Sequence, residues 1–235
     1  MGGVSPSASV SDEAMLDARP RRRLAREATV YAEGSEPDQV WFIHDGLVKL
    51  ETTAAGGATA LVAFRGPGEW LGEHAALDGS PRLTTAIVAR DATVTSISRD
   101  HFVDVVGSDP ELALRLLTSF VGHLRASVRH ELRLASGDPT ELVADRLRSL
   151  ASEPRFASAR STRGGTLSIE MPVSHEELAT WAGVSRRSVE SALQQFRAAG
   201  TISTGRMRVD VHDLAALGPR VAGPVDEAPA GTATG

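Results

Sequence analysis

A run of apolar residues at four-residue spacing in the middle of the chain limits the folds open to it more than any other feature. The run follows Pro110 and comprises Leu112, Leu116, Phe120, Leu124, Val128 and Leu132. This spacing is typical of one face of a helix, and it predicts a helix over residues 110–136, roughly 37 Å long. Because such a helix extends beyond a small domain, we expect it to pair with a second copy of the chain. The residues expected to form this dimer contact are Leu117, Phe120, Val121, Leu124 and Val128. The alternative is that the helix packs wholly against the domain that precedes it.

Short strand-like runs separated by turn signals fill residues 29–98. The runs 40–43 and 47–51 flank Asp45-Gly46, which predicts a hairpin turn. Further runs cover residues 61–64, 86–89 and 94–97, with a glycine-containing turn at 54–58 and another turn at Arg90-Asp91. Many short strands with regular turns are typical of a β-barrel or sandwich.

After the long helix, Gly137-Asp138-Pro139 interrupts the pattern and a second amphipathic helix follows. Residues 167–171 alternate like an edge strand. We therefore expect an unstructured N-terminus (1–18), a barrel domain (19–109), the long helix (110–136), a C-terminal domain (137–217) and an unstructured tail (218–235).

Helix-capping residues mark two consecutive helices in the C-terminal domain. Ser174 and Glu177 form a capping box at the start of the first helix. Gly183 permits a left-handed turn, and Ser185 caps a second helix over residues 186–199. Helix, turn and helix together predict a helix-turn-helix.

The second helix carries Arg186 and Arg187 in its first turn, where a purely structural helix favours acidic residues. In a helix-turn-helix this end meets DNA. We expect Arg187 to contact guanine and Ser185, Arg186 and Ser188 to contact phosphate. The remaining expected DNA-facing residues are Ser174, Glu190, Ser191 and Gln194.

A hairpin is expected after Gly200, with strands at 201–203 and 206–209 around a Thr204-Gly205 turn. It would place Arg206 and Arg208 on one face as a basic wing, which predicts a winged helix-turn-helix. The alternative is a helical hairpin with no nucleic-acid role.

Charge and composition narrow the function classes. The net charge is −5, but residues 183–209 carry five arginines against one glutamate, a local net charge of +4. The absence of cysteine excludes disulfides and thiolate metal sites. We expect no membrane segment or secretory signal, and therefore a cytoplasmic protein. No catalytic motif and no metal-ligand spacing is present, so we expect neither an enzyme nor a metal site.

A second dense motif covers residues 72–86, between two expected strands. A short helix from Glu73 would direct its free amides toward an anion, and Arg82 after Pro81 can donate two parallel hydrogen bonds to a phosphate. Glu73 can accept a hydrogen bond from a sugar hydroxyl. These groups suit a phosphorylated ribose; the alternative is a surface ion pair between Arg82 and Glu73.

Residues 28–217 resemble the bacterial cyclic-AMP receptor protein/FNR family of transcription regulators. Residues 72–86 are similar to the phosphate-binding cassette of cyclic-nucleotide domains. By that resemblance Glu73 binds the ribose 2′-hydroxyl and Arg82 the cyclic phosphate. The other cassette positions in the implied ligand site are Gly72, His74, Ala75, Leu83 and Thr84, and Ser127 of the long helix is the implied base contact.

Some positions depart from the family pattern. Leu83 stands where a small residue is usual and would narrow the pocket, and Ala76 and His74 are uncommon at their positions. In the second helix Arg187 replaces a common glutamate and Ser191 a common arginine. The usual family half-site on DNA is therefore not assumed.

The resemblance implies an α+β fold: an N-terminal antiparallel β jelly-roll barrel, a long dimerisation helix and a C-terminal winged helix-turn-helix. It implies a homodimeric regulator that binds double-stranded DNA at a near-palindromic site, with RNA polymerase as a candidate partner. A cyclic nucleotide is the implied effector, with cAMP favoured and cGMP or another nucleotide left open. The alternative is a family member with another ligand or none, whose barrel serves only for dimerisation.

Overall fold

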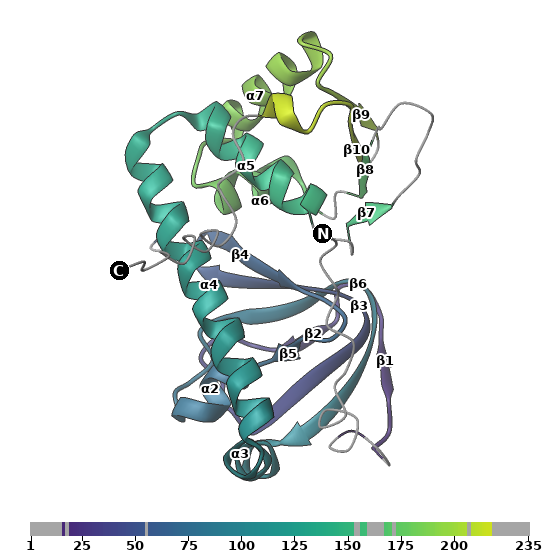
Figure 1. The fold of residues 1–235 in the computed structure, drawn as a ribbon, viewed down its shortest axis with the longest axis vertical. Helices are drawn as coiled ribbons and strands as arrows, with labels where there is room; N and C mark the ends of the chain where they lie inside the picture. Colours follow the sequence, from purple (N-terminus) through teal and green to yellow (C-terminus); the bar gives the residue numbers. More distant parts are fainter. Residues whose placement is uncertain are drawn as a thin grey trace, which may run out of the picture.

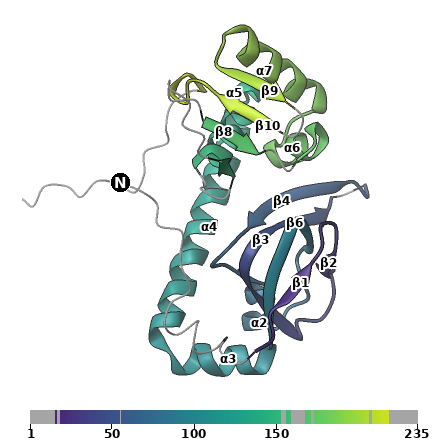
Figure 2. The same ribbon diagram turned by 90° about the vertical axis from the view of Figure 1, so that its right-hand side faces the viewer.

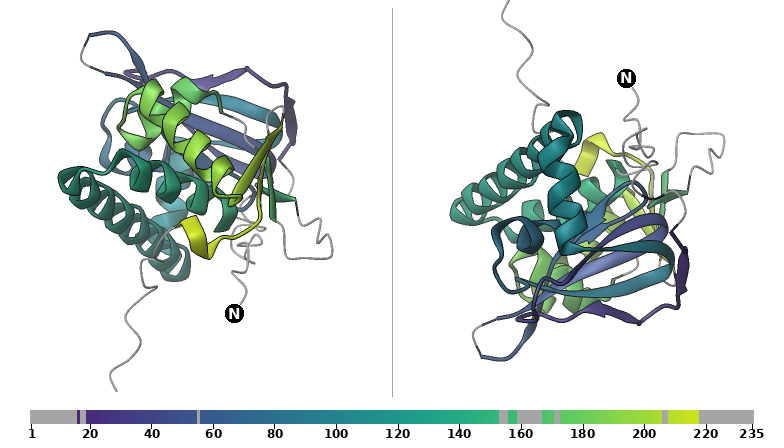
Figure 3. Two further views of the ribbon diagram at one scale, coloured as in Figure 1. Left: turned by 90° about the horizontal axis from the view of Figure 1, so that it is seen from above. Right: turned by 90° about the horizontal axis from the view of Figure 1, so that it is seen from below.

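One long helix runs alongside a first folded unit and leads to a second one (Figure 1). The computed structural model describes residue 16 and residues 19–54, 56–152, 156–158, 167–170, 173–205 and 208–217. Strands form the first unit, and short helices with a small sheet form the second. The views along the long axis show the long helix lying beside the barrel (Figure 3).

The first unit is an antiparallel sheet that curls into a barrel (Figure 2). Its strands are β1 (Arg22–Leu24), β2 (Thr29–Tyr31), β3 (Gln39–Thr53), β4 (Thr59–Arg65), β5 (Trp70–Leu71) and β6 (Thr85–Ser98). The order is β1-β6-β3-β4, with β2 paired to β6 and β5 to β3. The expected α+β fold with an N-terminal antiparallel barrel is confirmed.

The hairpin turn expected at Asp45-Gly46 is wrong, because both residues lie inside β3, which continues through to Thr53. Arg90-Asp91 likewise lies inside β6. The pairing of β3 with β6 shifts register on both sides of Asp45, which is the signature of a bulge. Gly46 has φ +99°, and a Cβ there would lie 2.4 Å from the Ala92 Cα. Glycine is therefore required where the two long strands approach closely. The turn at residues 54–58 is confirmed, since the Ala54 amide donates to the Ala58 carbonyl at 2.8 Å.

Three helices pack on the barrel: α2 (Glu73–Asp78), α3 (Arg99–Ser108) and α4 (Pro110–Ser136). Their shared core contains Phe42, Trp70, Phe102 and Leu112. Leu16 is buried in the same cluster, although it belongs to the segment expected to be unstructured. The other residues of 1–18, and the tail 218–235, lie outside the described residues.

Helix α4 follows the expected range, but its apolar residues divide between two faces. Leu112 and Leu116 are buried against the barrel, and Phe120 packs partly buried beside them. Seven large apolar side chains of α4 are exposed, among them Leu132 and Leu134 near its end. The other five form a second face: Leu114, Leu117, Val121, Leu124 and Val128. Their spacing alternates between three and four residues, as in a coiled-coil seam.

The second unit packs three helices on a small sheet. Its helices are α5 (Pro139–Ser152), α6 (His175–Ala182) and α7 (Arg186–Ala198), with a 3-10 turn η1 (Ala215–Leu217). Its strands are β7 (Ala157–Ser158), β8 (Leu167–Glu170), β9 (Ile202–Gly205) and β10 (Arg208–Val211), in the order β7-β8-β10-β9. The edge-strand prediction for residues 167–171 is wrong, since β8 lies between β7 and β10.

The wing differs from the expected hairpin in its turn. Thr204 and Gly205 belong to β9, and Gly205 pairs with Arg208 at the start of β10. The turn expected at Thr204-Gly205 is therefore wrong, because both residues are paired with β10. Arg206 itself lies outside the described residues.

The two units share a hydrophobic core where α6 meets β4 (Figure 2). Phe64 of β4 contacts Trp181 of α6 edge-on at 5.5 Å, and the Leu61 amide donates to the Thr180 hydroxyl at 3.2 Å. Lys49 of β3 donates to Glu177 of α6 at 2.6 Å. These contacts hold the second unit against the barrel.

Candidate functional site

A cavity of about 690 Å³ lies between the barrel, α4 and the second unit. The barrel side consists of β2, β3, β4 and the segment around α2. Helix α4 forms the opposite wall, and α5 and α6 form one end. The described residues that carry charge or a ring in its lining are Tyr31, Arg65, Trp70, Glu73, His74, Arg82, His123, His130, Glu131, Arg146 and Trp181. Its volume lies within the range of small-molecule sites.

Arg82 is the most buried charged side chain of the cavity, with 3 % of its surface exposed. Its Nη1 donates to the Gly72 carbonyl at 2.8 Å, and its Nη2 donates to the Gln39 carbonyl. Gly72 has φ +77°, and a Cβ there would lie 2.1 Å from Arg82 Nη1. Glycine at position 72 is therefore required both by the backbone and by the close approach of the arginine.

Two aromatic rings hold the Arg82 guanidinium. Its Cζ lies 4.6 Å from the centre of the Tyr31 ring and 5.3 Å from that of Trp41, which are cation–π distances. Burial lowers the pKa of Arg82, and Tyr31, Asp38 and Glu73 act against that shift. Its Nε is buried and has no hydrogen-bond partner among the described residues. An unpaired buried donor is costly, so this atom is positioned to bind an acceptor from outside.

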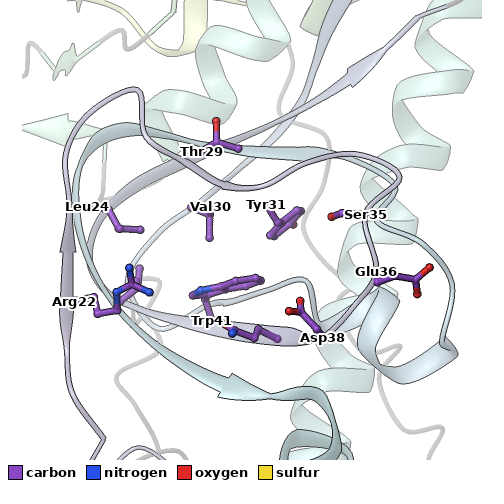
Figure 4. Close-up of a pocket in the computed structure, with 11 residues that line it drawn as sticks. Arg22, Leu24, Thr29, Val30, Tyr31, Ser35, Glu36, Asp38 and Trp41 are labelled. Atoms are coloured by element: carbon purple, nitrogen blue, oxygen red, sulfur yellow. The ribbon is translucent and has the colours of Figure 1, made fainter.

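Sequence reasoning missed Tyr31 and Trp41, which lie 51 and 41 residues before Arg82. Burial and the Glu73 carboxylate raise the pKa of Tyr31, so its phenol stays protonated. The rings of Tyr31 and Trp41 also line a second cavity, of about 490 Å³ (Figure 4). Figure 4 shows the Asp38 carboxylate directed into that space beside Trp41. The only feature of the sequence that sets either ring apart is that Tyr31 is the single tyrosine of the chain.

Glu73 opens helix α2 and is 6 % exposed. The Nε2 atom of His74 lies 3.6 Å from Glu73 Oε1. The alternative of a surface ion pair between Arg82 and Glu73 does not hold, because both side chains are buried. The helix predicted to start at Glu73 is confirmed.

The other cassette residues lie around this centre. Ala75 is buried, and Thr84 lines the cavity beside Arg82 and Leu83. Leu83 lines the cavity but is 73 % exposed, so it lies at the entrance and does not narrow the interior as expected. The His74 ring contacts the Phe120 ring at a tilt of 60°, with centroids 4.5 Å apart, and Phe120 is half-buried.

The α4 wall presents five residues to the cavity: His123, Ala126, Ser127, His130 and Glu131. Ser127, expected as the base contact, therefore shares the cavity with Glu73 and Arg82. Across from it Arg65 Nη2 donates to His123 Nδ1 at 3.4 Å. Burial, followed by the Arg146 charge, lowers the pKa of His130. Sequence reasoning did not identify Arg65 or the two histidines, because nothing local connects residue 65 with residue 123.

The far end of the cavity is closed by the second unit through Arg146, Thr180 and Trp181. Arg146 donates from Nε to the Trp181 carbonyl at 2.8 Å and lies over the Trp181 ring at 4.8 Å. Burial lowers the pKa of Arg146 to about 10. The cavity is therefore lined by both units.

The helix-turn-helix is formed by α6 and α7, and its expected caps are confirmed. Ser174 and Glu177 make the capping box, Gly183 is left-handed with φ +70°, and the Ser185 hydroxyl accepts from the Ser188 amide. Helix α7 lies on the side of its unit that faces away from the barrel (Figure 1).

The expected DNA-facing residues of α7 lie on its exposed side. Arg186, Arg187, Glu190, Ser191 and Gln194 are exposed, and Ser188 is half-buried. In the free chain Arg186 is paired with Glu190 at 2.9 Å, whereas Arg187 has no partner among the described residues. On the wing, Arg208 pairs with Asp210 at 2.9 Å. Ser174 is exposed at the start of α6.

A β-barrel with a cavity beside it, a long helix and a helix-turn-helix with a wing are the architecture of a two-domain DNA-binding protein. Residues 21–109 match the cyclic nucleotide-binding domain, and residues 143–219 match the Crp-like helix-turn-helix domain. No described helix is long and apolar enough to cross a membrane.

Relatives of known function agree with this class. The chain is 30 % identical over 218 residues to the CRP-like cAMP-activated global transcriptional regulator of Mycobacterium tuberculosis, covering 93 % of this chain and 94 % of that protein. It is 32 % identical over 196 residues to the transcriptional regulator LdrP of Thermus thermophilus, covering 83 % and 94 %. The crystal structure of a CRP-family regulator, also from Thermus thermophilus, matches with a TM-score of 0.68 at 28 % identity, covering 83 % and 94 %.

The chain belongs to the CRP/FNR family of transcription regulators. It is a DNA-binding regulator with a cyclic nucleotide-binding domain, and this family is not enzymatic. Its DNA-binding element is the Crp-like helix-turn-helix.

Proposed function

We propose that this chain is a homodimeric transcription regulator whose DNA binding is controlled by a cyclic nucleotide in the cavity beside α2. The buried Nε of Arg82, unpaired within the described residues, carries this proposal. A phosphate oxygen would satisfy it and would also accept from the neighbouring Nη group. The Glu73 carboxylate beside it would accept a hydrogen bond from the ribose 2′-hydroxyl.

The charge of the cavity supports a ligand with one negative charge. Its lining carries three arginines, Arg65, Arg82 and Arg146, against Glu73 and Glu131. With its histidines neutral, the lining has a net charge of +1, which complements the single charge of a cyclic phosphodiester. cAMP is the first candidate, because the M. tuberculosis relative is described as cAMP-activated.

One observation favours the alternative, in which the barrel binds another ligand or none and serves only for dimerisation. Two of the Arg82 nitrogens are already bonded to the carbonyls of Gly72 and Gln39. These bonds hold the arginine without any ligand. They also leave Nε and one hydrogen on each terminal nitrogen for a phosphate, so the nucleotide remains the stronger proposal.

The DNA-binding side of the proposal rests on α7. Two copies of α7 would enter successive major grooves of a near-palindromic site, about 34 Å apart. The unpaired Arg187 is the proposed guanine contact, with Ser185 and Ser188 near phosphates. This role places the protein in the cytoplasm, with RNA polymerase as its candidate partner at a promoter.

The homodimer is supported by the exposed seam on α4, formed by Leu114, Leu117, Val121, Leu124 and Val128. The alternating three- and four-residue spacing of these side chains suits knobs-into-holes packing with a second copy. Dimerisation is typical of the family. Phe120, also expected in the dimer contact, is half-buried with its ring against His74, and its place in the dimer stays a prediction.

Titration calorimetry of the purified protein with cAMP and cGMP tests the nucleotide. We expect binding heat for at least one of them, and we expect Arg82→Ala to abolish it. Arg23→Ala, which removes an exposed arginine of β1 outside the cavity, is the matched control and should bind as the wild type does. Absence of heat from both nucleotides with the wild-type protein would contradict the proposal.

A further inference from the structure

Arg146, at the far end of the cavity, is a partly buried cation whose terminal nitrogens are open to a ligand. Its Nε donates to the Trp181 carbonyl at 2.8 Å, and its Cζ lies 4.8 Å from the centre of the Trp181 ring. These two contacts fix the guanidinium in place. They leave Nη1 and Nη2, which carry four of its five N–H donors, without a hydrogen-bond partner among the described residues.

The carboxylates near Arg146 pair with other residues or lie in solvent. Asp145 acts to raise the pKa of Arg146, but its carboxylate pairs with Arg133 and Arg148. Glu131 lines the same cavity, but it is exposed and makes no ion pair with Arg146 within the part of the chain that the structure describes. Burial therefore dominates and lowers the pKa of Arg146 to about 10. A desolvated cation without a paired charge is costly, and an anion in the cavity would offset that cost.

The imidazole of His130 lines the cavity from α4 within reach of the Arg146 charge. Its Nδ1 is buried and has no hydrogen-bond partner among the described residues. Burial, followed by the Arg146 charge, lowers the pKa of His130, while Asp145 and Glu131 act against this shift and Arg133 adds to it. His130 is therefore neutral at about pH 7. The far end of the cavity thus holds an unpaired guanidinium and an unpaired imidazole nitrogen, and neither supplies negative charge.

Arg82 and Arg146 are held by different parts of the protein but face one cavity. Arg82 belongs to the barrel and bonds to the Gly72 carbonyl, whereas Arg146 belongs to α5 and bonds to α6. One cavity of about 690 Å³ reaches both side chains, so it can hold two anionic groups at once. The net charge of +1 applies while His130 is neutral. An anion at Arg146 would raise the pKa of His130 and favour its charged form, which supplies a second positive charge.

We infer that the far end of the cavity is a second phosphate-binding subsite, in which Nη1 and Nη2 of Arg146 bind a phosphate group. A guanidinium and a phosphate form two parallel, charge-assisted hydrogen bonds. The phosphate is either the second phosphodiester of a cyclic dinucleotide that spans the cavity, or free phosphate beside a cyclic mononucleotide. The inference rests on the proposed function only in placing the first phosphate of the effector at Arg82. Because α5 and α6 belong to the DNA-binding domain, a phosphate at this subsite contacts that domain directly.

Thermal unfolding of the full chain in inorganic phosphate tests the subsite without any nucleotide. A ligand of the folded state raises Tm by mass action, and phosphate also stabilises proteins in general because it is excluded from their surface. Relative to chloride at equal ionic strength, the wild type should therefore gain more in Tm than Arg146→Gln, whose amide can still donate to the Trp181 carbonyl. Arg146→Lys keeps the charge and should regain part of the difference. The matched control is Arg148→Gln, which removes an arginine of α5 that is not among the described lining residues and should gain as much as the wild type.

Titration calorimetry then identifies the source of the phosphate. The probes are cAMP and cGMP, each with and without inorganic phosphate, and the cyclic dinucleotides of adenine and of guanine. If the effector brings both phosphates, Arg146→Gln should weaken binding of a cyclic dinucleotide about tenfold or more, as the loss of a charge-assisted hydrogen bond does, and leave the Kd of the mononucleotides unchanged. If free phosphate fills the subsite, it should strengthen binding of a mononucleotide to the wild type and not to Arg146→Gln.

The outcomes separate this inference from the proposed function. Equal gains in Tm for the wild type and Arg146→Gln, with equal affinities of both proteins for any cyclic dinucleotide that binds, would refute the subsite while the nucleotide site at Arg82 stands. A gain in Tm that depends on Arg146, without binding of any nucleotide, would support the subsite and overturn the proposed effector. A loss in Arg148→Gln equal to that in Arg146→Gln would assign the effect to α5 as a whole and refute the role of Arg146.

Discussion

Lys49, the only lysine of the chain, is expected to contribute measurably to the attachment of the DNA-binding domain. Its Nζ lies 2.6 Å from Oε1 of Glu51 and 2.6 Å from Oε1 of Glu177, and its side chain is 20 % exposed. Exposed ion pairs contribute about 0–1 kcal/mol, whereas removing one partner of a buried pair costs about 3–5 kcal/mol. For this partly exposed site we expect Lys49→Met to cost about 2 kcal/mol, which lowers Tm by about 4–8 °C in a chain of this size.

A double-mutant cycle isolates the contact between the domains. The variants are Lys49→Met, Glu177→Gln and the two combined, measured by thermal and urea unfolding. Glutamine at 177 keeps the capping box with Ser174, so α6 should still form. We expect a coupling energy above about 1 kcal/mol; a value below about 0.3 kcal/mol would show that the pair contributes nothing. Arg26→Met, which removes an exposed ion pair with Glu27 at 3.6 Å, is the control and should change stability little.

The contribution of the Lys49–Glu177 ion pair to stability depends on pH. Burial acts to lower the pKa of Lys49, but its hydrogen bonds to Glu177 and Glu51 outweigh burial and raise it. Burial acts to raise the pKa of Glu177, but its bonds with Lys49 and Ser174 outweigh burial and lower it. A lowered carboxyl pKa stabilises the fold above about pH 4.3, and a raised lysine pKa stabilises it below about pH 10.4. The stability difference between wild type and Lys49→Met should therefore be greatest between these pH values and shrink beyond them.

Three further outcomes are expected. Gly72→Ala forces a side chain into a left-handed backbone conformation and against Arg82. Thermal unfolding should show that the free energy of unfolding falls by at least about 1–2 kcal/mol. An unchanged Tm would contradict the packing described. Arg187→Ala should weaken binding to the cognate site by about 1–3 kcal/mol in gel-shift titrations, and an equal loss on every DNA sequence would make it a phosphate contact. Leu124→Asp, at a side chain that is 64 % exposed, should yield a folded monomer in analytical ultracentrifugation; an intact dimer would refute the seam.

Features that depend on a few neighbouring residues could be predicted from the sequence. The capping box of Ser174 and Glu177, the left-handed Gly183 and the helix starting at Glu73 each depend on residues within four positions of one another. The long helix followed from its period alone. The period did not show which face meets the barrel, and only the structure shows that Leu112 and Leu116 are buried against it while Phe120 contacts His74.

The corrections concern features that depend on distant partners. Asp45-Gly46 has the local chemistry of a turn, but β6 pairs with β3 on both sides of it, and the close approach of Ala92 explains the glycine. Arg82 was identified from its motif. Its aromatic partners Tyr31 and Trp41 were not, because they come from other strands. Likewise, the pairing of Arg65 with His123 joins β4 to α4 across 58 residues.

Helix α6 belongs to three parts of the structure at once. It is the first helix of the helix-turn-helix, its Glu177 bonds to Lys49 of the barrel, and its Thr180 and Trp181 close the ligand cavity. A ligand in that cavity can change the placement of the DNA-binding domain only if it binds two placements with different affinity. Trp181 provides such a difference, since moving α6 away from β4 would remove a wall of the cavity and separate Trp181 from Phe64. A ligand large enough to reach Trp181 therefore binds the docked placement differently from an open one, and by linkage DNA changes the affinity for that ligand by the same factor.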